Sequence, residues 1–362
     1  MKTILFKYTT LLLFALPMAL IAHDGKLKGR YTKEKTIKKE YDVDSDALLK
    51  VKNSYGSLNV TSWSENRILI EVHIKTNGNN EEKVQRKLDE IKVDFEASRD
   101  VVSARTIFNS NKRNWGINWG KNNVNMQVNY TIKLPIKSSV HLNNDYGSII
   151  LDRVDGHAKI NCDYGRLEIG ELRGRNNELK FDYTSNSSIE FMNSGSIKAD
   201  YSGFTLGKTN DLKLDADYTN SKVKQMKNLN YNCDYGKLEV FEADDVTGNG
   251  DYINVDLGTI HGDVQINADY GSLKIDEMAS DGGSVTVESD YTGIKMGYNP
   301  QYHFNFELDL EYAGFKGRDG LEINISKEKS TSKYYKGFYG NQSSGNSISI
   351  KSDYGGVTFY KN

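Results

Sequence analysis

The stretch HLNNDYGSIILDRVDGHAKINCDYGRLEIG, residues 141–170, contains the motif Asp-Tyr-Gly twice, at Tyr146 and Tyr164. This motif or a close variant recurs along the chain at intervals of 17 to 21 residues, with one gap of 42 before the last copy. Because 42 is twice 21, we expect that one copy has been lost within a longer loop. An isolated relative, SYGSL, precedes the series. The shared position is occupied by twelve of the 23 tyrosines: Tyr55, Tyr146, Tyr164, Tyr183, Tyr201, Tyr218, Tyr235, Tyr252, Tyr270, Tyr291, Tyr312 and Tyr354.

The residues around each tyrosine alternate in the manner of a β-strand. Apolar residues lie four and two positions before it, as Ile160 and Cys162 do, with polar residues such as Asn161 between them. This period of two predicts a strand with one buried face. After the tyrosine the apolar positions change parity, as at Leu167 and Ile169, so the chain must turn a corner at the tyrosine. A further apolar position about eight residues after it predicts another short segment.

A period near 18 residues over most of a chain is typical of a solenoid. We therefore predict an all-β fold, a parallel β-solenoid or β-helix of about a dozen coils of roughly 18 residues, with a small N-terminal α+β cap. The coils would stack at about 4.8 Å, the usual spacing of neighbouring strands. Columns of Leu, Ile and Val would form the core.

Residues 1–22, MKTILFKYTTLLLFALPMALIA, have the pattern of a secretory signal peptide: a short basic start, an apolar run and a small residue at the end. The alternative is a membrane helix, but the run is shorter than the roughly 20 residues that span a bilayer and contains Pro17. We expect the mature chain to have no transmembrane helix and to be exported to the periplasm, the outer-membrane surface or the extracellular space.

We expect residues 23–140 to form the cap, including one early coil around Tyr55, and residues 141–362 to form the solenoid. Within the cap, strands are predicted at 48–53, 57–62, 67–76, 92–97, 101–108 and 124–134. A charged helix is predicted from the apolar stripe Val84, Leu88, Ile91 and Phe95. Such a cap would cover the open edge of the first coil. Residues 326–345 are predicted to be a polar loop before the final coil that helps to close the other end.

The composition excludes several classes of protein. The net charge of −2 argues against a nucleic-acid binder, and two cysteines cannot hold a disulfide scaffold. Cys162 and Cys233 occupy equivalent positions four coils apart, at about 19 Å if coils are about 4.8 Å apart. A disulfide requires Cα atoms within about 7 Å, so we expect two free, buried thiols.

The segments SYGSLNVTSW (54–63) and NYTIKLP (129–135), together with the Asp-Tyr-Gly repeats, resemble the DUF4097 family of adhesin-like, β-strand-repeat proteins. The resemblance extends over roughly residues 45–360. It implies an exported bacterial envelope protein with a solenoid fold. The family has no catalytic residues that could be carried over to this chain.

An acid precedes most of the repeat tyrosines, and stacked coils would place these acids in a row. At about 4.8 Å, neighbouring charges repel by roughly 0.9 kcal/mol in water-like surroundings and about 3.5 kcal/mol at an effective dielectric of 20. One possibility is a ladder that binds Ca²⁺ through oxygen ligands. The favoured alternative is an Asx turn, in which each carboxylate accepts the backbone N–H two residues later. The residues concerned are Asp145, Asp163, Asp182, Asp200, Asp217, Asp234, Asp251, Asp269 and Asp290, with Asp353 and Glu311 at the last two coils.

The tyrosine row has two interpretations as well. An exposed aromatic stripe could bind sugars or a partner, whereas a packed ladder would stabilise the stacking of the coils. We favour the packed ladder. Two further aromatic segments are candidates for a binding surface. They are NWGINWGKNN, with Trp115 and Trp119, and the polar loop of the tail, with Tyr334, Tyr335, Phe338 and Tyr339.

Motifs of known enzyme classes are missing. The six histidines have no metal-binding spacing, and there is no nucleophile elbow, P-loop or dinucleotide-binding fingerprint. We therefore expect a non-enzymatic, adhesin-like binding or scaffold module without a cofactor, with a surface glycan or an envelope protein as its partner. The alternatives are a carbohydrate-active β-helix enzyme, such as a polysaccharide lyase or hydrolase, and a purely structural envelope protein.

Overall fold

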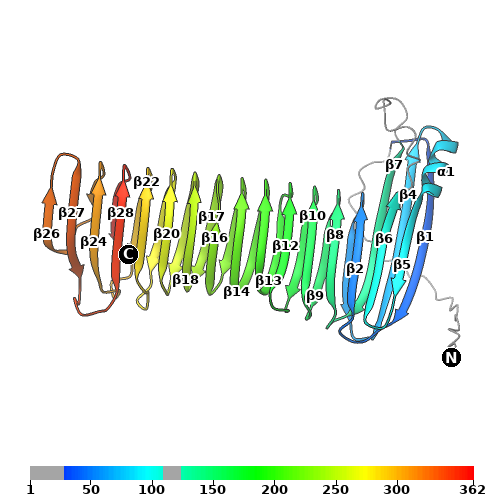
Figure 1. Cartoon of the computed structure of the whole chain (residues 1–362), viewed down its shortest axis with the longest axis horizontal. Helices are drawn as coiled ribbons and strands as arrows, with labels where there is room; N and C mark the ends of the chain where they lie inside the picture. The colour runs from blue at the N-terminus through cyan, green and yellow to red at the C-terminus, as the bar shows by residue number, and fades with distance from the viewer. Residues whose placement is uncertain (1–27, 109–123) are drawn as a thin grey trace, which may run out of the picture.

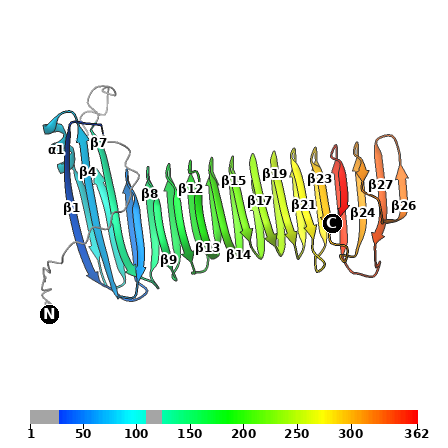
Figure 2. The same cartoon turned by 180° about the vertical axis from the view of Figure 1, so that it is seen from behind.

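Each coil of the protein consists of two strands joined at a repeat tyrosine. We describe a computed structural model that covers residues 28–108 and 124–362. The coils stack into a long parallel β-solenoid with two broad faces, one seen in Figure 1 and the other in Figure 2. This is the all-β solenoid that the repeat predicts. The predicted signal peptide, residues 1–22, lies outside the described residues.

The strands that precede the tyrosines form the first face, which we call face A. In stacking order these strands are β2 (Leu48–Ser54), β8 (Ser139–Asp145), β10 (Ala158–Asp163), β12 (Asn177–Asp182), the second half of β13 (Ser187–Asp200), the second half of β14 (Gly203–Asp217), β16 (Asn228–Asn232), β18 (Asp245–Asp251), β20 (Val264–Asp269), β22 (Val285–Asp290), β28 (Ser347–Asp353) and β24 (Phe304–Glu311).

The strands that follow the tyrosines form face B. They are β3 (Leu58–Trp63), β9 (Ile149–Val154), β11 (Leu167–Leu172), the first halves of β13 and β14, β15 (Asn220–Gln225), β17 (Gly236–Ala243), β19 (Ile253–Ile260), β21 (Ser272–Met278), β23 (Gly293–Tyr298), β29 (Val357–Lys361) and β25 (Phe315–Lys316).

The core lies between the two faces and is built from the predicted columns. Residues four and two positions before the tyrosine are buried, as Leu142 and Cys162 are, and so are those after it, such as Leu167 and Ile169. The positions eight residues after the tyrosine, including Val154 and Leu172, are buried too. In parallel register each side chain packs on its equivalent in the next coil.

One pair of coils breaks the column four residues before the tyrosine, where most coils have Leu, Ile or Val. Tyr231 occupies this position in one coil, and Gly248 is its partner in the next. A Cβ added to Gly248 would lie 2.2 Å from the Tyr231 ring, so only glycine leaves room for that ring. The large and the small residue therefore compensate each other across neighbouring coils.

The N-terminal end of the rod is closed by five strands and a helix: β1 (Tyr31–Asp42), β4 (Arg67–Gly78), α1 (Glu81–Glu90), β5 (Ile91–Ala97), β6 (Val101–Phe108) and β7 (Asn125–Pro135). The coil of Tyr55, formed by β2 and β3, stacks on β8 and β9. Outside it, β6 pairs with β2 and β7 pairs with β3. Antiparallel strands β5, β4 and β1 complete the two faces (Figure 1).

The helix α1 is shorter than its apolar stripe predicts. Asn80 caps its start by accepting the Lys83 N–H at 2.9 Å. The Lys35 ammonium closes its other end by donating to the carbonyls of Leu88 and Ile91 at 2.6 and 2.7 Å. Ile91 already has an extended backbone and begins β5. Ile91 and Phe95 thus belong to a strand, because apolar residues four apart are compatible with either structure.

Two predictions for the C-terminal end are wrong. The wide gap in the repeat is not a lost copy, because the last coil, β28 and β29, inserts between the coil of Tyr291 and the coil of Tyr312. The predicted polar loop at 326–345 instead contains most of a hairpin of two antiparallel strands, β26 (Glu322–Glu328) and β27 (Ser332–Tyr339), which pairs with β24 and closes the rod. Alternation of polar and apolar residues within 332–339 is the signal that the loop interpretation missed.

Candidate functional site: the tyrosine ridge and the aspartate row

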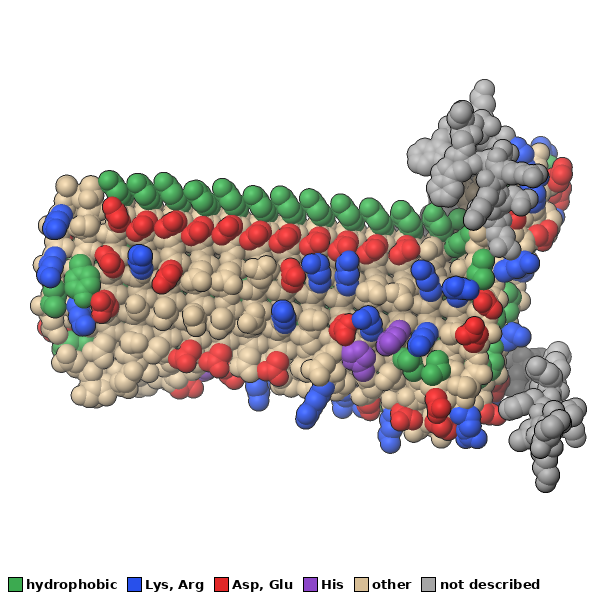
Figure 3. Space-filling view, in the orientation of Figure 1, with side chains coloured by type: hydrophobic (Ala, Val, Ile, Leu, Met, Phe, Trp, Pro, Cys, Tyr) green, Lys and Arg blue, Asp and Glu red, His purple; other side chains and the backbone are tan. Residues whose placement is uncertain are grey.

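The twelve repeat tyrosines form one continuous ladder, which we call the tyrosine ridge. Neighbouring ring centroids lie 4.6 to 5.1 Å apart, and the ring planes deviate from parallel by 8° at most. Each tyrosine nevertheless remains 42 to 54% exposed. Figure 3 shows the ridge as an unbroken row of side chains along one edge of the rod.

Every tyrosine of the ridge has a left-handed backbone, with φ between 50° and 64°. This conformation makes the corner that the change of parity requires, and for a non-glycine residue it costs roughly 1 to 2 kcal/mol. Eleven of the tyrosines donate their backbone N–H to the carbonyl of the acid in the adjacent coil, and Tyr312 donates to Thr331. An aromatic pair contributes about 0.5 to 1.5 kcal/mol beyond its buried area. Stacking therefore offsets much of the backbone strain.

Stacking also decides what the ridge can present to a partner. Because each interior ring lies between two others, its faces are covered, and its edge and hydroxyl group are what remains exposed. At the N-terminal end the rings of Phe108 and Tyr55 pack perpendicular to each other, with centroids 5.8 Å apart. The ridge thus combines both interpretations, since it is a packed ladder and an exposed stripe. Between its two ends the ridge offers no open ring faces of the kind on which sugars usually stack.

The acids that precede the tyrosines form the second row in Figure 3, which we call the aspartate row. The Asx-turn prediction is wrong for this row. The carboxylate of Asp217 accepts the backbone N–H of Asp234 in the next coil at 3.1 Å, and Asp234 accepts that of Asp251 at 2.9 Å. The same bond joins Asp182 to Asp200, Asp200 to Asp217, and Asp269 to Asp290. The carboxylates thus connect neighbouring coils rather than closing their own turns.

The charges of the row are incompletely solvated and close together. Burial, assisted by the neighbouring acids, raises the pKa of Asp163, Asp217 and Asp251 above the usual value for aspartate. Among residues 28–108 and 124–362, no group of three or more His, Cys, Asp or Glu side chains is arranged to hold a metal ion. The calcium ladder remains a prediction.

The two cysteines are free and buried, as predicted from their spacing. Burial raises the pKa of both thiols to about 12, so each is a poor nucleophile at neutral pH. Cys162 lies close to the Gly147 carbonyl, with its Sγ at 3.5 Å. Both cysteines therefore act as small core residues.

Of the two aromatic candidate segments, the structure describes only the second. Trp115 and Trp119 lie outside the described residues. The second segment is strand β27, in which Tyr335 and Tyr339 are buried in the core of the C-terminal cap. Tyr334 and Phe338 point to the other side of the strand and are only partly exposed. An exposed aromatic loop is thus not found there, and the ridge provides the exposed aromatic surface instead.

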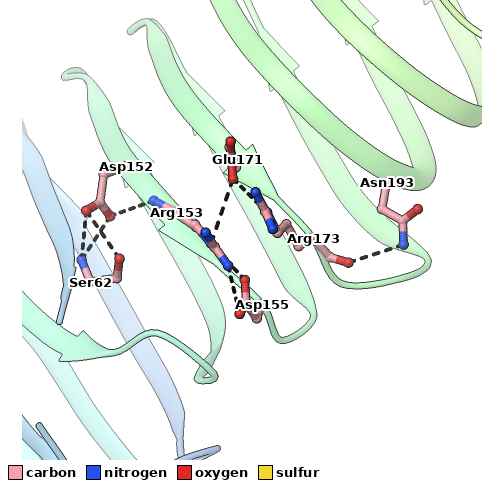
Figure 4. Close-up of polar contacts among 7 residues, drawn as sticks. All are labelled: Ser62, Asp152, Arg153, Asp155, Glu171, Arg173 and Asn193. Carbon is pink, nitrogen blue, oxygen red and sulfur yellow. Dashed lines mark hydrogen bonds and ion pairs between the residues drawn. The ribbon is translucent and has the colours of Figure 1, made fainter. Parts of the chain in front are cut away.

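A charged cluster lies on face B at the corner remote from the ridge (Figure 4). Arg153 contacts Asp155 at 2.9 Å and Glu171 at 3.7 Å, and Arg173 contacts Glu171 at 2.7 Å. The hydrogen bond from Arg173 lowers the pKa of Glu171, whereas a general acid needs a raised pKa. In the same view Asp152 accepts the Ser62 N–H from the neighbouring coil. These contacts join coils through paired charges.

Two open hollows of similar size lie on opposite faces of the rod. The ridge-side hollow, about 850 Å³, lies on face B along Tyr201 and Tyr218. The remote hollow, about 840 Å³, crosses face A and is lined by Ser196, Lys213 and Asn230 among others. Its acid Glu178 is paired with Lys159 at 2.6 Å, which lowers the pKa of that carboxyl. Neither hollow was predicted from the sequence, because each is lined by residues from four or more coils that lie far apart in the chain.

No protein-family model matches the chain, and no curated protein matches it in sequence, so the resemblance to DUF4097 has no support from a family model. Several solved structures align with most of the chain. A "putative cell adhesion protein" from Clostridium sporogenes is 12% identical, with 91% of this chain and 100% of that chain covered and a TM-score of 0.19. A "putative adhesin" from Parabacteroides distasonis is 8% identical, with 92% and 98% covered and a TM-score of 0.31.

A "putative lipid binding protein" from Parabacteroides distasonis is also 8% identical, with 90% of this chain and 96% of that chain covered and a TM-score of 0.31. Such identities and TM-scores are too low to transfer a function from those proteins to this chain. Within the part of the chain that the structure describes, no helix is long and apolar enough to span a membrane.

Proposed function

We propose that the protein is an exported envelope protein that acts as a non-enzymatic, adhesin-like binding or scaffold module, and that the tyrosine ridge with its aspartate row is the surface it presents. The observation that carries this proposal is the continuity of the ridge. All twelve tyrosines stack in one row while each stays about half exposed. A continuous exposed apolar row of this kind is typical of an interaction surface.

The regular spacing suggests how such a surface would bind. Each coil offers the same small set of groups, a phenol hydroxyl and a carboxylate, on a rigid parallel scaffold. A partner with repeated groups can then make many weak contacts at once, and the second and later contacts form at high effective concentration. Avidity of this kind needs no deep pocket.

The distribution of charge favours binding over catalysis. The acids and arginines that come together away from the aspartate row are paired with one another, as Glu171 is with Arg153 and Arg173. In the remote hollow Glu178 is paired with Lys159. A hydrolase would need an acid with a raised pKa in a groove, and among the described residues the acids with raised pKa values belong to the repeating row.

The test is retention of the purified chain on wells coated with isolated bacterial envelopes. The variant Y235N/Y252N/Y270N removes three consecutive rungs, and asparagine tolerates the left-handed backbone at these positions. We expect at least a tenfold loss of retention. The matched control S196A/K213A/N230A changes three neighbouring coils on the other face and should be retained like the wild type.

Equal retention of the ridge variant and the wild type would overturn the proposed function, provided that both have the same circular dichroism spectrum. Release of reducing ends or unsaturated sugars from envelope polysaccharide by the wild-type chain would favour the enzymatic alternative instead.

A further inference from the structure

The ridge-side hollow has walls and a floor of different chemistry. Tyr201 and Tyr218 line one side with their ring edges. The strand residues of the lining, which we call the floor, include the small or hydroxyl-bearing residues Ser188, Gly203 and Thr205. The lining comes from four consecutive coils, so the hollow extends across these coils along the axis of the rod.

The hollow forms where the length of the coil changes. Tyr183 and Tyr201 are 18 residues apart, and Tyr201 and Tyr218 are 17 apart. The extra residue lies in the corner between Tyr183 and β13, where Asn186 has a left-handed backbone with φ of 55°. In the next coil, a Cβ added to Gly203 would meet nothing closer than a carbonyl oxygen at 4.0 Å, so open space lies above it.

The polar groups of the floor repeat at the spacing of the coils. Ser188, Thr205, Lys222 and Glu239 are successive partners in one register column. Gly203, Asn220 and Lys237 form the adjacent column. Neighbouring members of a column are about 4.8 Å apart. A ligand that uses these groups must be extended and must repeat its own polar groups at nearly the same interval.

The floor carries no uncompensated charge. Lys237 pairs with Glu239 at 2.7 Å and with Asp256 at 2.9 Å, and Lys222 approaches Glu239 at 3.9 Å. The remaining polar groups are hydroxyls and amides, which donate and accept hydrogen bonds. The stacked faces of Tyr201 and Tyr218 are not available for a planar aromatic ligand. These features fit a neutral, hydroxyl-rich ligand that binds through hydrogen bonds along its edges.

We propose that the ridge-side hollow binds a neutral, extended β-1,4-linked glycan, with one sugar ring on each coil. In its extended form such a glycan advances with each sugar by nearly the distance between neighbouring strands, so each sugar lies over one coil. Successive sugars are flipped, so the two hydroxyl-bearing edges of the sugars alternate over the floor from coil to coil. An α-1,4-linked glycan curves and loses this register. The proposal rests on the proposed function, because it assigns a ligand to the surface beside the ridge.

The test is isothermal titration calorimetry of the full chain with cellohexaose and chitohexaose, and with maltohexaose as the α-linked control. We expect binding of at least one β-linked hexaose and at least tenfold weaker binding of maltohexaose. Because four coils line the hollow, the tetraose should bind nearly as well as the hexaose, and the biose much more weakly. Absence of binding by both β-linked hexaoses, or equal binding of maltohexaose, would overturn the proposal.

Two variants locate the binding. Gly203→Phe places a large side chain within the hollow and should lower the affinity at least tenfold. S188A/T205A removes two hydroxyls from exposed or half-buried positions without adding bulk, and should lower it severalfold. The control S196A/K213A/N230A should bind like the wild type, and unchanged affinity in both test variants would contradict the site. If the hexaoses fail to bind while Y235N/Y252N/Y270N still loses envelope retention, the glycan proposal falls and the proposed function stands.

Discussion

The middle of the rod and its two ends are built from the same coil, but the ends use the order of the chain differently. From Tyr146 to Tyr291 each coil stacks on the one that precedes it in sequence. At the N-terminal end the chain forms one coil, leaves it to build the cap, and returns to the inner side of that coil. At the C-terminal end the chain first builds the outermost coil, that of Tyr312, and the hairpin. It then returns and places its last coil, that of Tyr354, between the coils of Tyr291 and Tyr312.

Closing a solenoid and extending it are therefore separate structural problems. An open parallel edge would invite pairing with another chain, and both ends place antiparallel strands outside the last coil. The C-terminal arrangement makes the cap depend on the last residues of the chain. The N-terminal cap depends much less on its outermost strand.

The largest expected effect comes from deleting the last coil, residues 347–362. Its buried side chains Ile348, Ile350, Val357 and Phe359 each contribute roughly 1.5 to 3 kcal/mol, so roughly 6 to 12 kcal/mol is lost together with the parallel partner of β24. We expect the C-terminal cap to unfold, which limited proteolysis followed by mass spectrometry will detect as cleavage within 299–346. Deleting residues 28–42, which removes the edge strand β1, should leave the solenoid resistant to the same protease.

A smaller effect tests the regular middle. Gly248→Ile places a side chain where the Tyr231 ring lies and should destabilise the protein by about 1 to 3 kcal/mol or more. Combining it with Tyr231→Leu restores the usual column and should recover most of the stability lost in denaturant unfolding. Tyr231→Leu also removes a hydroxyl that is buried without a hydrogen-bond partner. Purely additive effects would mean that the two residues do not compensate each other.

The ladder allows the middle and the end to be compared directly. Tyr218 stacks on two neighbouring rings, whereas Tyr312 stacks on only one within the described residues. Both have left-handed backbones, so Tyr218→Asn and Tyr312→Asn keep the local conformation accessible. We expect the decrease in melting temperature to be about twice as large for the interior variant, since aromatic stacking contributes roughly per contact. Equal decreases would show that stacking contributes little.

The smallest expected effect concerns the aspartate row. The pKa values of Asp163, Asp217 and Asp251 are raised in the folded protein, so the native state binds protons more tightly than the unfolded chain does. Above these raised values the charged row destabilises the fold, and the variant D163N/D217N/D251N should melt a few degrees higher than the wild type at pH 7. The difference in melting temperature between the variant and the wild type should disappear as the pH falls through the raised pKa values toward the usual value of about 3.9. An advantage independent of pH would exclude charge repulsion as its cause.

The repeat made the middle of the rod predictable from sequence, because parallel stacking requires the same residue type at each level. Leu142, Ile160 and Leu179 form one column in the sequence and in the core. The order of the last coils was not predictable in this way, since the columns of Ile350 and Leu308 are alike and either could follow Val287. The bonds of the aspartate row were missed because Asp-Tyr-Gly also fits a local turn. The hollow beside Tyr201 borders a corner that is one residue longer than the corner of the next coil.

The continuity of the ridge requires that the last coil lies between the coils of Tyr291 and Tyr312. Oxidative crosslinking of paired cysteines tests this order directly. Glu288 and Lys351 are exposed register partners in adjacent coils, and Asp309 is the partner of Lys351 on the far side. E288C/K351C should form an intramolecular disulfide, whereas E288C/D309C should not, because two coil spacings of about 4.8 Å exceed the reach of about 7 Å. A disulfide in E288C/D309C and none in E288C/K351C would place the coils in chain order and contradict the account.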